Sequence, residues 1–175
     1  MTTGQEKATL ALQYAIQMEI DGKELYLKAS RESGNEFGKK LMASLAQQED
    51  YHRQKFEQIF ETIRKSRKWP IVEFKADGGK TLRTIFADES NNPTTTIKVA
   101  QTEIDAVRKA MQVEDKSYDL YHQRYEQAAK GAEREFYETI AGEEREHKLI
   151  LVDYYEYLQD PAAWFVKAEH HSLDG

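Results

Sequence analysis

The segment Glu49–His52, with the sequence EDYH, recurs 95 positions later as Glu144–His147, with the sequence EREH. Each copy of this Glu-x-x-His motif follows a lone glutamate, Glu19 or Glu114, at the same distance and without a gap. The same offset relates further identical pairs around the motifs. These are Ala15 and Ala110, Gln17 and Gln112, Leu25 and Leu120, Tyr26 and Tyr121, Ala46 and Ala141, and Glu61 and Glu156. The chain is therefore expected to contain two structurally related halves.

Apolar residues recur at three- and four-residue spacing in four segments, which is the pattern of amphipathic helices. We expect helices over residues 7–30, 37–65, 96–129 and 132–158. Ser33-Gly34-Asn35 separates the first two helices, and Lys130-Gly131 separates the last two. Because both connections are short, each pair should form an antiparallel hairpin.

The two hairpins are joined by a long connection, residues 66–95, and structureless loops of this length are uncommon in compact domains. It is compatible with a small β-hairpin or with an extended arm that precedes a short helix around Leu82–Phe86. We favour the arm and helix. After the fourth helix, Asp160-Pro161 is typical of a helix start, which predicts a short tail helix through Trp164 and Phe165.

These elements predict an all-α fold, an antiparallel four-helix bundle of ferritin type with a long crossover between its second and third helices. We expect one domain spanning residues 1–175, with the two hairpins related by a pseudo-two-fold axis. The crossover is long enough for subunits to exchange helix pairs, and a homodimer or higher homo-oligomer is expected.

Composition excludes several classes of function. The net charge of −6 gives no general attraction to nucleic acid or anionic lipid. The absence of cysteine excludes disulfides, zinc knuckles and cysteine-held iron–sulfur centres. No segment has the length and apolarity of a membrane span, and residues 1–18 lack the apolar core of a signal peptide. We expect a cytoplasmic protein.

The repeated acidic residues lie on the apolar faces of their predicted helices, where unpaired carboxylates are costly. Lys23 is the main cation placed to neutralise them, whereas two divalent ions would balance four carboxylates completely. In Glu-x-x-His both side chains project from one helical face, so they can bind one ion together. Mixed carboxylate and imidazole ligation suits iron or manganese, with zinc as an alternative. The predicted ligands are Glu19, Glu49, His52, Glu114, Glu144 and His147.

Other residues near the motifs have two interpretations. Glu143 competes with Glu144 as a ligand, but it aligns with Gln48 and has no histidine at i+3, which favours Glu144. Tyr26 and Tyr121 are equally compatible with hydrogen bonds to the ligands and with ordinary core packing. Gly22 and its repeat partner Ser117 are expected to leave room for substrate or water. His122, His170 and His171 are interpreted as surface or tail residues.

The residues Ala15-Ile16-x-x-Glu19, Tyr26, the two Glu-x-x-His motifs and Glu114 resemble the rubrerythrin branch of the ferritin-like superfamily. The resemblance covers the bundle helices, residues 7–65 and 96–158. It implies a carboxylate-bridged di-iron centre, with Glu49 and Glu144 as bridges, that reacts with peroxide or oxygen. Glu19, Glu49, Glu114 and Glu144 would act in catalysis through the metal centre.

The chain departs from the rubrerythrin pattern at two points. Where rubrerythrins carry a second carboxylate on the third helix, this chain has Ser117, which puts efficient peroxide reduction in doubt. The rubredoxin domain is also missing, because there is no cysteine, so the resemblance implies a separate electron-donor protein. Two alternatives remain open: an iron-binding or storage protein with ferroxidase activity, and a non-catalytic bundle in which metal is a structural staple.

Overall fold

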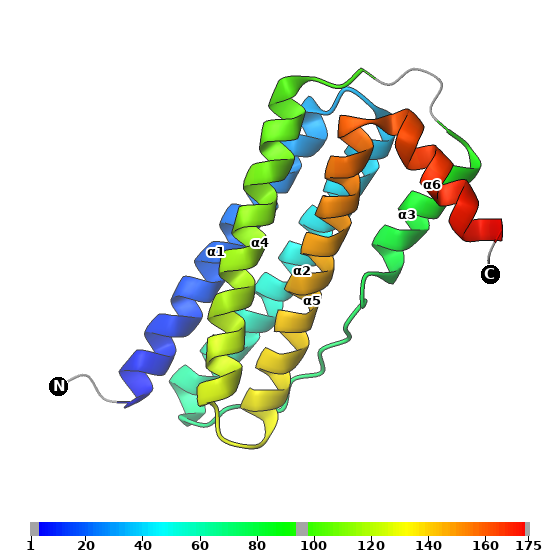
Figure 1. Ribbon diagram of the computed structural model, residues 1–175. Coiled ribbons are helices and arrows are strands. Elements are labelled where there is room, and N and C mark those ends of the chain that lie inside the picture. The colour runs from blue at the N-terminus through cyan, green and yellow to red at the C-terminus, as the bar shows by residue number, and fades with distance from the viewer. Residues whose placement is uncertain (1–3, 94–97, 174–175) are drawn as a thin grey trace.

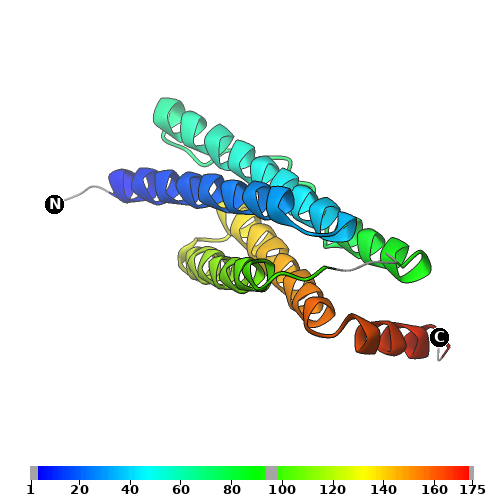
Figure 2. The ribbon, with the colours of Figure 1, turned by 90° about the horizontal axis from the view of Figure 1, so that it is seen from above.

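A computed structural model of the chain describes residues 4–93 and 98–173. Its elements are the helices α1 (Gly4–Glu32), α2 (Glu36–Ser66), α3 (Lys80–Asn91), α4 (Gln101–Gln127), α5 (Ala132–Gln159) and α6 (Pro161–Leu173). The described residues contain no strand. The predicted all-α, ferritin-like bundle is confirmed: α1 and α2 form one hairpin, α4 and α5 the other, and the two pack as layers in Figure 2.

Local signals explain where the long helices begin and end. Asn35 caps α2, because its side-chain Oδ1 accepts a hydrogen bond of 2.6 Å from the backbone N–H of Gly38. Arg67 ends α2 in the left-handed conformation, with a φ of 58°. Gly131 precedes α5 with a φ of 124°, which favours glycine at this turn.

The prediction that the third bundle helix starts at residue 96 is wrong for residues 98–100, which the structure describes. Residues 98–100 are not helical, Ala100 is extended, and α4 begins at Gln101; residue 96 itself lies outside the described residues. Val99 is β-branched, which weakens its preference for a helix, and its side chain packs against the core from this non-helical segment.

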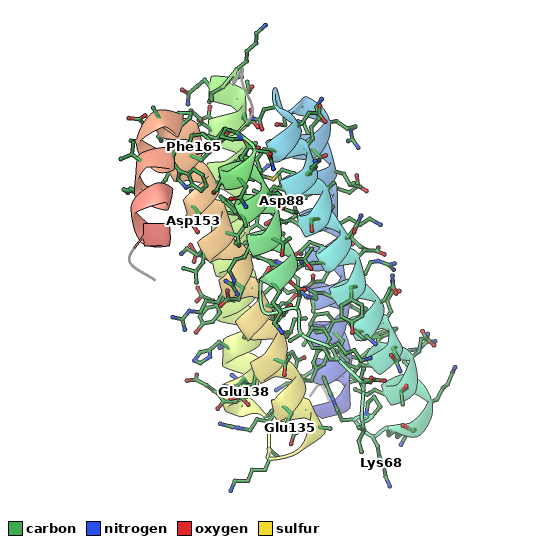
Figure 3. All side chains as sticks on the ribbon, turned by 90° about the vertical axis from the view of Figure 1, so that its right-hand side faces the viewer. Lys68, Asp88, Glu135, Glu138, Asp153 and Phe165 are labelled. Carbon is green, nitrogen blue, oxygen red and sulfur yellow. The ribbon has the colours of Figure 1, made fainter. Side chains whose placement is uncertain are left out.

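The crossover consists of an extended arm, residues 67–79, followed by α3, as the sequence predicted. In Figure 1 it runs along one side of the bundle, and Figure 3 shows it in front of α2 and α5. Leu82 and Phe86 anchor α3 in the core. The predicted tail helix is α6, whose Trp164 ring contacts Phe86 and Tyr157.

The interior contains two apolar clusters, one toward each end of the bundle. One includes Leu12, Phe56, Ile59 and Phe136, and the other includes Leu41, Leu45, Leu151 and Tyr154. Between them lies a layer of buried charged side chains. The apolar clusters stabilise the bundle and keep water from this layer at both ends.

Candidate metal centre

The six acidic and imidazole residues of the sequence repeat converge in the middle of the bundle. They form two groups, and in each group the candidate ligand atoms lie within 4.8 Å of one another. One group combines Glu19 with His52, and the other combines Glu114 with His147; Glu49 and Glu144 belong to both. Each helix of the bundle contributes, because α1 and α4 supply the lone glutamates while α2 and α5 supply the Glu-x-x-His motifs. Glu49 and Glu144 are therefore the two carboxylates that could be shared if each group held an ion.

The polar atoms of these six residues are buried without adequate partners. Their exposed fractions range from 0% for Glu144 to 3% for Glu49. Among the described residues, nine buried side-chain nitrogen or oxygen atoms lack a hydrogen bond, and seven of them belong to this cluster. Both carboxylate oxygens of Glu144 are among the seven. Since buried polar groups are almost always satisfied in folded proteins, this set of inward-facing atoms fits bound cations.

Both histidines direct Nδ1 at the carboxylates. Nδ1 of His52 lies 3.1 Å from Glu144 and 3.4 Å from Glu19. Nδ1 of His147 lies 3.0 Å from Glu49 and 3.7 Å from Glu114. The two rings are nearly parallel, with centroids 5.4 Å apart. The geometry therefore makes Nδ1 the candidate ligand atom of each imidazole.

The imidazole rings of His147 and His52 contact different neighbours outside the carboxylate cluster. Nε2 of His147 lies 2.7 Å from Oε1 of Gln48, so an N–H at this position donates to the amide and leaves Nδ1 free for a metal. The His52 ring instead packs against Phe74 of the crossover, at a centroid distance of 5.7 Å. The sequence analysis missed the role of Gln48. Its position immediately before Glu49, and its alignment with Glu143, were the available signals.

Two buried tyrosines connect the halves of the site crosswise. The hydroxyl of Tyr26, on α1, donates to Glu114 on α4, and the hydroxyl of Tyr121, on α4, donates to Glu19 on α1. Burial and the neighbouring carboxylates raise the pKa of both phenols well above the usual value, so both keep their protons. The ligand-contacting interpretation of these tyrosines thus fits the geometry, and each also belongs to an apolar cluster.

The charges in the site perturb one another strongly. Burial, followed by repulsion from Glu19, raises the pKa of Glu49; burial, followed by repulsion from Glu49, raises the pKa of Glu144. Burial opposes ionisation of Glu114 as well, but the neighbouring His147 lowers its pKa overall. Burial also opposes protonation of His147, yet Glu114 and Glu49 raise its pKa. Without cations, the raised pKa values of Glu49 and Glu144 favour protonation, which relieves repulsion among the buried carboxylates.

A rubrerythrin family model matches residues 11–155, which include α2, α4, most of α1 and α5, and all six candidate ligands. The chain belongs to the rubrerythrin family. Comparison with curated proteins and with solved structures found no match. Neither the sequence nor the described residues contain a cysteine. None of its described helices is long and apolar enough to cross a membrane.

Three neighbouring residues have roles other than those considered from the sequence. Glu143 is absent from both ligand groups; its carboxylate accepts hydrogen bonds from the backbone N–H groups of Asp77, at 2.9 Å, and Gly78, at 2.8 Å. Lys23 forms an ion pair of 2.7 Å with Asp50 instead of neutralising the cluster. The room expected beside Gly22 is filled, because a Cβ there would lie 2.8 Å from Oε2 of Glu49.

Proposed function

We propose that Glu19, Glu49, His52, Glu114, Glu144 and His147 bind two iron ions, and that the protein is a di-iron oxidoreductase of rubrerythrin type. Its substrate would be peroxide or oxygen, and a separate electron-carrier protein would restore the reduced state. The observation that carries this proposal is the set of seven inward-facing ligand atoms without a hydrogen-bond partner, in a chain that belongs to the rubrerythrin family. Two divalent ions would neutralise the four carboxylates.

The iron pair, when bound, supplies the two electrons that reduce a peroxide. With two protons taken up from water, cleavage of the O–O bond of hydrogen peroxide would yield two molecules of water. The chain supplies the geometry and excludes water. Tyr26 and Tyr121 hold protons against Glu114 and Glu19 and orient these carboxylates, and Gln48 orients His147. Phe74 covers the His52 side of the centre.

Ser117 stands where the rubrerythrin pattern has a second carboxylate on the third bundle helix. It is buried on α4, one helical turn after Glu114, where it has no carboxylate to offer a metal. The centre then has four carboxylates and two imidazoles, with no spare acidic ligand at this position. We expect peroxide reduction to be slower than in chains that carry a glutamate there, and a Ser117→Glu variant should accelerate it.

The proposal is tested by loading the protein with iron without oxygen, then measuring metal content and the rate of reoxidation by hydrogen peroxide. We expect two iron ions per chain and reoxidation that is lost in Glu144→Ala. Binding of two zinc or manganese ions in preference to iron would support the site but contradict the redox chemistry. Absence of bound metal in the wild-type protein would refute the proposal.

A further inference from the structure

The buried centre has no open path from solvent. The seven ligand atoms without a hydrogen-bond partner are inaccessible to solvent, and the apolar clusters close both ends of the bundle. A hollow lined by residues of α4 and α5, including Tyr118 and Leu149, does not reach the oxygens of Glu114 and Glu144 that lack a partner. An ion from solution therefore has to pass a part of the structure that opens.

Two other sides of the centre are closed by the contacts of the candidate ligands themselves. Between α1 and α4, the hydroxyls of Tyr26 and Tyr121 each donate to a ligand carboxylate on the opposite helix. Between α1 and α2, Gly22 lies so close to Glu49 that a Cβ would be 2.8 Å from Oε2. Opening either side would separate two bundle helices and disrupt the centre.

The crossover arm, residues 67–79, covers the remaining side, where α2 and α5 face outward in Figure 3. Its side chains alternate, since Val72 and Phe74 pack against the bundle whereas Ile71 is 93% exposed. The Phe74 ring lies 5.7 Å from the ring of His52, measured between centroids. Because Phe74 is itself partly exposed, this one side chain separates an imidazole of the centre from the outside of the bundle.

Few hydrogen bonds hold the middle of the arm on the bundle. The described residues contain no strand, so the extended backbone of the arm has no β-ladder partner. The backbone N–H of Lys75 donates to the hydroxyl of Tyr51 at 3.0 Å. The backbone N–H groups of Asp77 and Gly78 donate to Glu143 at 2.9 and 2.8 Å. Segments held by so few contacts open at a lower free-energy cost than the packed helices.

Both ends of the arm are anchored to the bundle. At the start of the arm, Trp69 contacts the ring of Phe136, with centroids 6.0 Å apart. At the end of the arm, the first turns of α3 are tied to α5 by the ion pair of Arg83 and Glu146, at 2.7 Å. Residues 70–77 can therefore move outward while both anchors and all four bundle helices stay in place.

The internal repeat indicates a specialised role for Glu143. Gln48 lies 95 positions earlier, and its side-chain oxygen is 2.7 Å from Nε2 of His147. The equivalent contact in the other half would join Glu143 to His52. In the structure Glu143 binds the backbone of the arm instead, and Phe74 lies against His52. Because the chain has one crossover, only this half uses the position to hold an arm.

We propose that residues 70–77 form a gate through which metal ions enter and leave the centre. Phe74 blocks the passage beside His52, and Glu143 holds the gate closed. This inference rests on the ion-binding part of the proposed function. Opening requires loss of the arm's hydrogen bonds to Glu143 and Tyr51 and withdrawal of Phe74 from His52.

The test follows the binding of Co²⁺ to the metal-free full chain by stopped-flow absorption, and its release after mixing with excess chelator. Phe74→Ala removes the blocking ring, and Glu143→Gln removes the charge and one acceptor oxygen that hold the arm. Leu149→Ala is the control for entry past α4 and α5, because Leu149 lines the hollow there and is 48% exposed. Hydrogen exchange at residues 75–78 of the metal-free proteins is a second readout that needs no metal.

We expect Glu143→Gln to raise hydrogen exchange at residues 75–78, and cobalt uptake and release, about tenfold each, since a hydrogen bond to a charged acceptor contributes at least that factor. Phe74→Ala should accelerate uptake and release at least as much. A gate alters both rates equally, so the affinity for cobalt should stay within about twofold of wild type. Leu149→Ala should change none of these quantities.

Four outcomes would overturn the gate. Cobalt rates that are unchanged in both Phe74→Ala and Glu143→Gln would show that ions do not pass the arm, and the metal centre would stand. Faster uptake in Leu149→Ala alone would locate the passage beside α4 and α5. Lower affinity with unchanged uptake would limit Phe74 to positioning His52. If the wild-type protein binds neither cobalt nor iron, the proposed function and the gate are both wrong.

Discussion

Replacing Glu144 by glutamine should stabilise the metal-free protein and destabilise the metal-loaded one. In the structure this carboxyl is 0% exposed and neither of its oxygens has a hydrogen-bond partner. Burial and repulsion from Glu49 raise its pKa above the ordinary value of 4.5. Glutamine keeps the shape of the protonated carboxyl but cannot ionise, so it removes the cost of a buried negative charge.

The magnitude follows from the pH dependence. Above pH 4.5 the unfolded chain releases this proton while the folded chain retains it, so the stability of the metal-free wild-type protein falls as pH rises toward the folded pKa. This one group lowers the free energy of unfolding by at most about 1.4 kcal/mol for each pH unit. Between pH 5 and pH 7, the difference in free energy of unfolding between metal-free Glu144→Gln and metal-free wild type should therefore grow by up to about 2.7 kcal/mol. This corresponds to on the order of 5–11 °C in melting temperature.

The assay is thermal unfolding of both proteins at pH 5, 6 and 7, with chelator and with excess ferrous iron under anaerobic conditions. Iron should reverse the order of stability, because Glu144 belongs to both ligand groups and its loss weakens both ion positions. The matched control is Glu143→Gln, whose carboxylate instead binds the crossover backbone. This control should lower stability with and without iron. A metal-free Glu144→Gln protein that is less stable than wild type at pH 7 would refute the reasoning.

Three further predictions concern residues that support the centre. Gln48→Leu removes the 2.7 Å contact to His147 and should lower the iron affinity of one of the two positions about 10- to 100-fold. Chelator competition measures both affinities, and an equal loss at both positions would contradict this prediction. Gly22→Ala places a Cβ 2.8 Å from Glu49 and should reduce iron stoichiometry below two per chain by elemental analysis, while leaving the helical circular dichroism unchanged. Glu143→Ala should increase hydrogen exchange at residues 77–78 at least tenfold, and unchanged protection would show that the arm is held by other contacts.

The repeated spacing of Glu19, Glu49 and His52 with their counterparts was sufficient to predict the bundle and the buried cluster that forms the candidate site. Helical periodicity places i and i+3 residues on one face, and buried carboxylates need cations, so these inferences need only local geometry and electrostatics. The short connections likewise specified the two hairpins, and Asp160-Pro161 indicated the start of the tail helix. These are properties of neighbouring positions along the chain.

Only the tertiary structure decided which long-range contacts surround that site. The contact between Gln48 and His147, the crosswise bonds of Tyr26 and Tyr121, and the position of Phe74 all join residues from different helices or from the crossover. The same holds for the hollow that Tyr118 of α4 and Leu149 of α5 line, since its shape depends on how the two helices pack. Sequence periodicity specifies which face of a helix is buried. It does not specify which partner that face meets, because that choice depends on packing of the whole bundle.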